Sequence, residues 1–283
     1  MSTVQLKCRH YRLDYGPAES AANTYQREKM VELVTEETAF VLVDTWELRG
    51  MDQYAVLPKV PRKDTRELVE PVVQNAIRPA LAAARRAGLL TIYMPSDYVV
   101  EKYPEHRQGI GGDGAAEVSC ERDWPPAAYT RQRCAEYLKD RYGIASEETQ
   151  ALDKERMAHT YIHSALRPRD GDLVLRDAEE LHGALRQHRI VNLIYVGFAL
   201  NMCMLWKPGA IFDMSTEYGR GYFTILLRDC TVAAENDQSL AELRQTQTFV
   251  EWIEMVMGYT STSGEFAAAL SDFEKDELHG GEV

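Results

Sequence analysis

The stretch Thr38-Ala-Phe-Val-Leu-Val-Asp44 decides the fold class of this chain. Six residues rich in β-branched and apolar side chains run without a polar interruption and end at an aspartate. A continuous run of this length, unlike an alternating one, is typical of a strand that is buried on both faces. Such strands occur in parallel sheets that are covered by helices on both sides.

The segments that follow this strand continue the pattern of a parallel sheet. From Glu67 to Ala87 apolar residues recur at spacings of three and four, and Gly88 follows as a helix C-cap. Leu89–Met94 is a second apolar run, so strand, helix and strand form a βαβ unit with a right-handed crossover. Further strands are expected at 172–176, 191–196 and 222–227, and further helices at 178–188, 202–218 and 239–257. This alternation predicts an α/β fold, a three-layer, doubly wound and mostly parallel sheet with helices on both faces.

Three segments are expected from the distribution of polar residues along the chain. Residues 1–37 are polar and carry only a weak helical pattern around Tyr25–Val34, which predicts an N-terminal arm. Residues 38–257 form the main domain, interrupted by an insertion at about 98–169 that we expect to cover a site. Residues 258–283 form a C-terminal tail, whose charged end FEKDELHGGEV is expected to fray.

Composition excludes several classes of function. The chain has 283 residues, 45% of them hydrophobic and 27% charged, which is enough to build a sizeable core. Its net charge of −12 would repel nucleic acid and anionic membranes. No apolar segment reaches about 18 residues, and the N-terminus lacks the apolar core of a signal peptide. Five widely spaced cysteines without a CxxC pair are expected to be free thiols, so the sequence predicts a cytoplasmic protein.

Two candidate catalytic residues follow predicted strands. In an open parallel sheet, ligands bind beyond the carboxyl ends of the strands, where Asp44 and Cys203 are expected. Cys203 begins a predicted helix, and a helix N-terminus favours the nucleophilic thiolate. The alternative is that Cys203 packs as a small buried hydrophobe, which is the more common role of a cysteine.

The amino-acid sequence around these residues resembles that of a known family. Gly197-Phe-Ala-Leu-Asn-Met-Cys203 follows the strand Leu193-Ile-Tyr-Val196, and Gly221-Tyr-Phe-Thr-Ile-Leu-Leu-Arg-Asp-Cys-Thr231 comes after it. Together with Phe40-Val-Leu-Val-Asp44, these segments closely resemble the isochorismatase-like cysteine hydrolases over about residues 38–257. The combination of the strand–GxxxNxC–helix element with the first strand is fairly specific.

The resemblance implies a reaction and roles for particular residues. Cys203 would attack the carbonyl carbon of a small amide, ureido or carbamoyl compound, forming an acyl-enzyme and breaking a C–N bond. Asp44 would take the thiol proton and pass it to the leaving nitrogen. The family also implies a cis peptide at Phe198–Ala199, with the N–H groups of Ala199 and Cys203 forming an oxyanion hole.

The sequence departs from the family at its third catalytic residue. The family carries a lysine just after the strand that begins with Gly-Asp, but here Asp177 occupies that position. Arg176 is adjacent, yet neighbouring side chains of a strand point to opposite faces. Lys102, in the insertion, is another candidate cation, although a solvated surface lysine is its more common role. An Asp44/Asp177 pair without a cation would oppose thiolate formation.

The remaining expectations concern ligands and partners. We expect no cofactor, and no metal because the nearest match to the Asp-x-His of metal-binding relatives, Asp52-Gln-Tyr54, lacks the histidine. The family commonly forms dimers or tetramers, so a homo-oligomer that acts on a small-molecule substrate is expected. The candidate substrate-binding residues are Trp46, Tyr98, Tyr103, Phe198, Asn201 and Trp206.

Two other functions remain open from the sequence. An isochorismatase-type enzyme of the same fold would hydrolyse a vinyl ether without a covalent thiol intermediate. A non-catalytic member would use the fold as a binding or assembly module, an alternative that the missing lysine favours.

Overall fold

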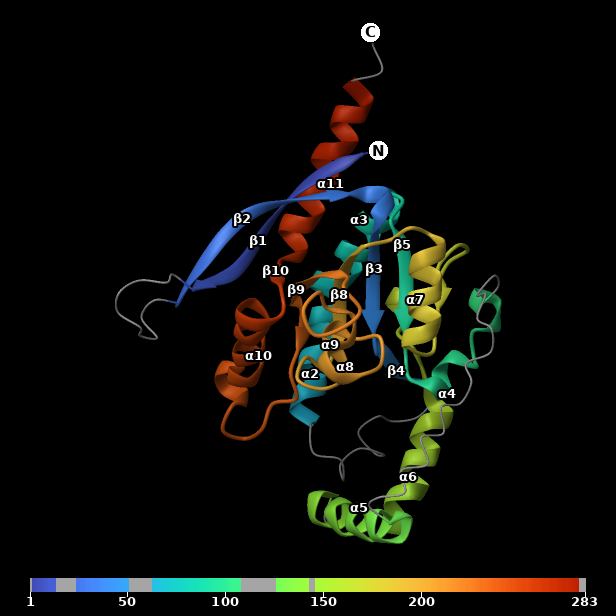
Figure 1. Cartoon of the computed structure of the whole chain (residues 1–283). Helices are drawn as coiled ribbons and strands as arrows, with labels where there is room; N and C mark the ends of the chain where they lie inside the picture. Colours follow the sequence, from blue (N-terminus) through green and yellow to red (C-terminus); the bar gives the residue numbers. More distant parts are fainter. Residues whose placement is uncertain (1, 14–23, 51–62, 108–125, 143–145, 280–283) are drawn as a thin grey trace.

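The computed structural model describes residues 2–13, 24–50, 63–107, 126–142 and 146–279. Within them, eight strands form one sheet in the order β2-β1-β10-β9-β8-β3-β5-β7 (Figure 1). The bounds of these strands are β1 Thr3–Leu13, β2 Thr24–Val34, β3 Thr38–Val43, β5 Leu90–Met94, β7 Leu173–Val174, β8 Asn192–Phe198, β9 Phe223–Val232 and β10 Tyr259–Ser261.

The centre of the sheet is parallel and fully buried. Strand β3 pairs in parallel with β5 on one side and with β8 on the other, and every residue of β3 is buried. Strand β9 continues the parallel order next to β8. The predicted α/β class and mostly parallel sheet are therefore confirmed, and the continuous apolar run of β3 is explained by helices on both of its faces.

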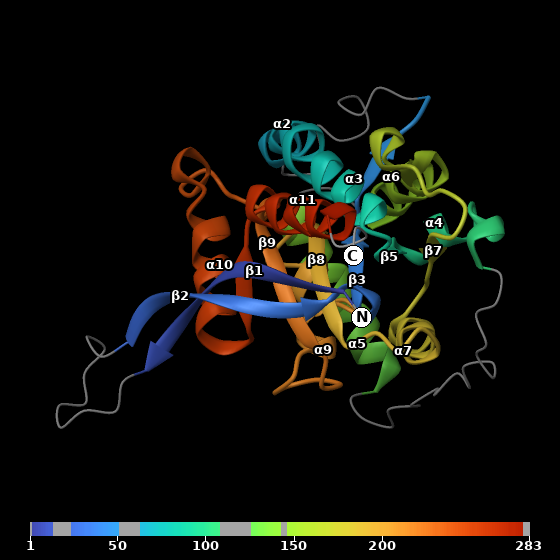
Figure 2. The same ribbon diagram turned by 90° about the horizontal axis from the view of Figure 1, so that it is seen from above.

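Helices cover both faces of the sheet (Figure 2). On one face lie α2 (Lys63–Val72), α3 (Arg78–Arg86) and α11 (Ser263–His279), and a π-helical turn joins α2 to α3. On the other lie α7 (Ala178–Gln187), α8 (Cys203–Trp206), α9 (Ile211–Met214) and α10 (Arg244–Val256). Each face has its own cluster of buried apolar side chains, so the molecule has the expected three layers.

The N-terminal segment is a β-hairpin. The weak helical pattern at Tyr25–Val34 does not correspond to a helix, because these residues lie in strand β2. Strands β1 and β2 pair antiparallel over their whole length, and Arg9 of β1 pairs with Thr260 of β10. Val31 and Leu33 are buried at every second position, which is the period of a strand. The hairpin thus extends the main sheet, and its far end projects past the body of the molecule (Figure 1).

Residues 259–279 form a strand and a helix, so the part of the charged end that the structure describes is helical. Strand β10 pairs in parallel with β9, and α11 follows it as far as His279. Phe266 and Leu270 of α11 are buried, and the Phe266 ring stacks on Phe40 of β3 with 5.7 Å between ring centroids. These apolar contacts hold α11 on the sheet, whereas residues 280–283 lie outside the described part.

The helix predicted over 202–218 is broken into α8 and α9. Pro208 follows Lys207, and a residue before proline is disfavoured in helical conformation. Gly209 comes next with φ at +81°, a conformation that glycine adopts without strain. The buried hydroxyl of Tyr195 donates to the Gly209 carbonyl oxygen at 2.8 Å, which fixes the break against β8.

The insertion at 98–169 is mainly helical where the structure describes it. It contains α4 (Asp97–Val100), α5 (Ala127–Tyr142) and α6 (Ser146–His159), and residues 108–125 and 143–145 lie outside the description. Strand β6 (Thr160–Ile162) pairs with β4 (Trp46–Leu48) in a small second sheet. Because β4 begins two residues after Asp44, this small sheet attaches the insertion to the carboxyl end of β3. None of the helices described has the length and apolarity needed to cross a membrane.

A buried carboxylate joins the hairpin to the rest of the sheet and gives a stability prediction. Glu254 of α10 accepts hydrogen bonds from Arg9 at 2.8 Å, Gln26 at 2.9 Å and Thr260 at 2.5 Å. We expect Glu254→Ala to lower the free energy of unfolding by about 2–3 kcal/mol, because three polar partners lose their acceptor. Urea denaturation measures the effect, and Glu251→Ala, at an exposed position of the same helix, is the control. Equal effects of the two substitutions would contradict this role.

Candidate functional site

Asp44 lies immediately after β3, at the carboxyl end of the parallel sheet. Its side chain is buried, with 4% of the residue exposed, and its φ is +44°, a left-handed conformation that aspartate tolerates better than most residues. Its backbone N–H donates to the Met94 carbonyl oxygen at 3.2 Å, and Ser96 Oγ donates to Oδ1 at 3.1 Å. The ends of β3 and β5 therefore hold the carboxylate in one place.

Gly197 allows β8 to approach β3 closely at this position. Its φ is +132°, and a Cβ atom there would lie only 1.9 Å from the Val43 carbonyl oxygen. Any other residue at position 197 would push apart the two strands that lead to Asp44 and Cys203. Steric exclusion of a Cβ atom therefore explains why the strand–GxxxNxC element begins with glycine.

The cation that contacts Asp44 is Lys207, which the sequence analysis missed. Its Nζ donates to Asp44 Oδ1 at 3.2 Å and to the carbonyl oxygens of Met94 and Pro95 at 3.0 Å and 2.5 Å. The lysine side chain is 12% exposed and that of Asp44 is 4% exposed, so this is a buried ion pair with all three ammonium hydrogens bonded. Buried ionised carboxylates need such a partner.

Cys203 is the first residue of α8 and is half-buried. The Phe198–Ala199 peptide before it is cis, as the resemblance implies. The Ala199 carbonyl oxygen accepts from the backbone N–H groups of Met202 at 3.0 Å and Met204 at 3.2 Å, which closes the turn that leads into the helix. The backbone N–H of Lys207 donates to the Cys203 carbonyl oxygen, so Cys203 and Lys207 lie one helical turn apart.

A signal for Lys207 was present in the sequence. A lysine four residues after a cysteine that begins a helix lies on the same face as that cysteine. The resemblance instead places the lysine at the strand end that Asp177 occupies here. Only the break at Pro208 and the position of Met94 and Pro95 reveal that the Lys207 ammonium reaches Asp44.

The three residues considered as replacements for the lysine are bonded elsewhere. Asp177 is the N-cap of α7, where Oδ1 accepts from the N–H groups of Glu179 and Glu180 at 2.9 Å each. Arg176 forms an ion pair with Glu101. Lys102 donates to three carbonyl oxygens at the end of α6, those of Met157, Ala158 and Thr160, and burial lowers the pKa of this lysine.

The candidate substrate-binding residues lie around the strand ends in different environments. Trp46 begins β4 and is half-buried, and Phe198 is buried at the end of β8. Trp206 is 53% exposed and packs against Phe212 and Trp252. The hydroxyl of Tyr98 accepts from Arg156 at 3.0 Å, and that of Tyr103 accepts from the Ile162 N–H at 3.1 Å.

Asn201 ties the cysteine turn to the segment after β9. Its side chain donates to the Ala234 carbonyl oxygen at 3.2 Å and accepts from the Ala234 N–H at 2.8 Å. The neighbouring Glu235 accepts hydrogen bonds from Ser239, Thr246 and the Gln245 N–H. The segment that follows β9 is thereby held beside the turn that precedes Cys203.

The expectation of no metal site concerned residues 52–54 in particular. Residues 52–54, the nearest match to the metal motif, lie outside the described part. Within the described ranges, no three or more histidine, cysteine, aspartate or glutamate side chains form a group that could hold a metal ion.

The N-cap position of Asp177 gives a stability prediction. We expect Asp177→Ala to lower the free energy of unfolding by about 1 kcal/mol, because two N–H groups of α7 lose their acceptor. Asp177→Ser keeps an acceptor and should recover most of this loss in the same urea titration. A serine variant as unstable as the alanine variant would exclude capping as the role of the side chain.

Glu235 gives a prediction of pH dependence. Burial alone would raise the pKa of this carboxyl, but the hydrogen bonds from Ser239, Thr246 and Gln245 outweigh burial and lower the pKa below its ordinary value of 4.5. Its stabilising contribution is therefore complete above 4.5 and is lost as the pH falls through the lowered pKa.

Comparison with Glu235→Gln measures this contribution. We expect the wild type to be more stable by about 1–3 kcal/mol near pH 7, and the difference to shrink when urea denaturation is repeated near pH 3. A difference that stays constant or grows toward acid would contradict the assigned direction.

Similarity to known proteins is found in the structure and not in the sequence. The sequence matches no family model and no curated protein. A solved cysteine hydrolase from Pseudomonas syringae pv. phaseolicola 1448A is 18% identical, and the alignment covers 85% of this chain and 95% of that one with a TM-score of 0.52.

Two further structures show weaker similarity. An isochorismatase family protein from Burkholderia thailandensis is 20% identical over 84% of this chain and 97% of its own, with a TM-score of 0.43. An isochorismatase from Pseudomonas putida KT2440 is 14% identical over 89% of this chain and 93% of its own, with a TM-score of 0.45. The similarity to the Pseudomonas syringae structure, together with the parallel order of β5, β3, β8 and β9, shows that the chain has the same α/β fold as that protein.

Proposed function

We propose that this protein is a cysteine hydrolase that cleaves a C–N bond in a small amide, ureido or carbamoyl compound. The observation that carries the proposal is the buried contact between Lys207 and Asp44, because Lys207 lies one helical turn after Cys203. A thiol, a carboxylate and an ammonium group thus come from two adjacent strand ends. The similarity of the fold to that of the Pseudomonas syringae cysteine hydrolase supports the same function.

In the proposed reaction Cys203 is the nucleophile. Asp44 takes the proton from Sγ, the sulfur bonds to the carbonyl carbon, and the C–N bond breaks as Asp44 passes the proton to the leaving nitrogen. Water then attacks the thioester, which releases the acid and returns the proton to the thiol. The N–H groups of Ala199 and Cys203 are proposed to bind the carbonyl oxygen as its negative charge develops.

Lys207 has two roles in this proposal. Its positive charge balances the buried Asp44 carboxylate, and its bonds to Met94 and Pro95 fix the position of that charge. A cation near the thiol also favours the thiolate over the neutral form. The non-catalytic alternative was favoured by the absence of a lysine at position 177 and by the shortened segment after Asp177, and a lysine beside Asp44 from another element answers the first of these two arguments.

Ammonia release from a panel of small amides, ureides and carbamoyl compounds tests the reaction. We expect turnover by the wild type, loss of at least about 100-fold in Cys203→Ala, and an acyl adduct on the wild type by intact mass spectrometry. Turnover that survives in Cys203→Ala would overturn the covalent mechanism and favour an isochorismatase-type reaction. No turnover on any compound, with Cys203 inert to iodoacetamide, would favour the non-catalytic alternative.

Substitution of Lys207 tests its assignment separately. We expect Lys207→Met to lower kcat by about 100-fold or more and to destabilise the fold, since Asp44 loses its buried counter-charge. Asp44→Asn/Lys207→Met should regain stability, which would show that the destabilisation of Lys207→Met comes from the unpaired Asp44 carboxylate. Lys102→Met is the matched control, and a loss of turnover in that variant equal to the loss in Lys207→Met would refute the choice of Lys207.

A further inference from the structure

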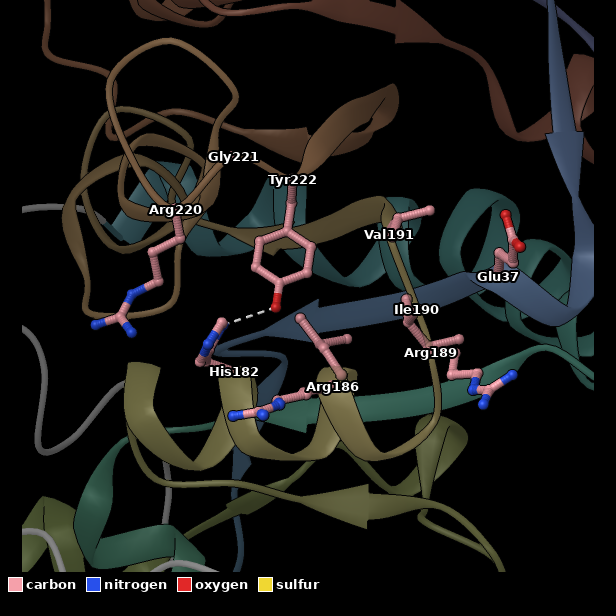
Figure 3. A pocket seen from close by; sticks show the side chains of 10 residues that line it. Glu37, His182, Arg186, Arg189, Ile190, Val191, Arg220, Gly221 and Tyr222 are labelled. Atoms are coloured by element: carbon pink, nitrogen blue, oxygen red, sulfur yellow. Dashed lines mark hydrogen bonds between the residues drawn. The ribbon is translucent and has the colours of Figure 1, made fainter.

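A hollow of about 520 Å³ lies at the end of the sheet opposite Asp44 and Cys203 (Figure 3). Its lining includes Glu37, Val191 and Tyr222, which directly precede β3, β8 and β9. These positions are at the amino ends of the strands, whereas Asp44 and Cys203 come after carboxyl ends. The volume is in the range of small-molecule sites. The hollow is therefore separate from the proposed catalytic site.

The charged groups of the lining are mainly arginines. Arg186, Arg189 and Arg220 line the hollow together with a single carboxylate, that of Glu37. Arg220 is held by Glu179 at 2.5 Å and Asp213 at 3.5 Å. Arg186 and Arg189 form no ion pair with any residue that the structure describes. The carboxylates of Glu37, Glu179 and Asp213 equal the three arginines in number, so Arg186 and Arg189 are the charges at this end that no described carboxylate pairs.

The arginines are not evenly spread along the hollow. In Figure 3, Arg186 and Arg220 extend toward the end where His182 lies, whereas Arg189 lies at the other end, nearer Glu37. Guanidinium groups present paired N–H donors that match the oxygens of a carboxylate or phosphate. The end lined by Arg186, Arg220 and His182 is therefore the end suited to an oxyanion.

His182 is oriented by a hydrogen bond inside the hollow. Its Nδ1 lies 2.7 Å from the hydroxyl of Tyr222, and the two rings meet edge to face. Burial raises the pKa of Tyr222. The hydrogen bond between its hydroxyl and Nδ1 fixes the imidazole ring, and Nε2 is the ring nitrogen that remains for a ligand.

The rest of the lining is apolar and open. Leu185 and Ile190 are buried in the floor, and Val191 is 50% exposed at the side. A Cβ atom built on Gly221 would meet nothing within 4 Å, so the chain leaves space beside Tyr222. An apolar floor with donors at one end suits a ligand with an apolar body and an anionic group at one end.

We propose that this hollow is a second binding site for a small organic anion, in which Arg186, Arg220 and His182 bind a phosphate or carboxylate group and Ile190, Val191 and Tyr222 contact an apolar body. The proposal does not depend on the proposed hydrolase activity. Its ligand would bind at a distance from Cys203 and without a covalent step.

Isothermal titration calorimetry with phenyl phosphate, benzoate and neutral benzyl alcohol tests the site on the full chain. We expect the two anions to bind and benzyl alcohol to bind at least about tenfold more weakly, because only the anions pair with the arginines. Inorganic phosphate should bind more weakly than phenyl phosphate, because it lacks the apolar body. Binding of the two anions should weaken as salt is added.

Variants locate the binding. Arg186→Gln is expected to weaken phenyl phosphate binding at least about tenfold, whereas Arg131→Gln, which removes the same charge from an exposed position on α5, should leave it unchanged. Cys203→Ala should bind like the wild type, so a failure of the hydrolase proposal would not affect this result. No binding by the wild type, or equal loss in Arg186→Gln and Arg131→Gln, would overturn the proposal.

Discussion

The contact between the Lys207 ammonium and the Asp44 carboxylate is the interaction on which the candidate site depends. The Asp44 side chain is buried and that of Lys207 is only 12% exposed, so each charge needs the other as its counter-ion. The same ammonium also binds the carbonyl oxygens of Met94 and Pro95. One cation therefore joins the end of β3, the end of β5 and the turn after α8, which are the elements that hold the proposed nucleophile and base.

The sequence predicted the centre of the fold because burial on both faces leaves a strong local pattern. Thr38–Val43 and Leu89–Met94 are unbroken apolar runs, and their parallel pairing was confirmed. The N-terminal hairpin lacks that pattern: much of β2 is exposed, so few apolar residues mark its period of two. Its strand conformation comes from pairing with β1 and from the bonds of Arg9 and Gln26 to Glu254, which no local pattern encodes.

The sequence predicted the position of the candidate site, but it did not identify Lys207 as one of its residues. Asp44 and Cys203 stand directly after apolar runs, so the rule for parallel sheets identifies them. Lys207 belongs to the site only because Pro208 ends α8 and because its side chain crosses to the end of β5. The position equivalent to the family's lysine instead caps α7 through Asp177. A charge requirement of the site can thus be met from a different element, which a search by aligned position does not detect.

The two ends of the sheet differ in how their charges are compensated. At the carboxyl ends, Lys207 is fully bonded and paired with Asp44, so the ion pair holds the proposed catalytic groups in place and leaves no surplus charge. At the amino ends, the described part of the chain offers Arg186 and Arg189 no carboxylate partner. A paired charge in the interior fixes geometry, whereas unpaired charge around a hollow attracts a ligand of opposite sign. The same chain therefore separates the proposed catalytic site from the hollow proposed to bind an organic anion.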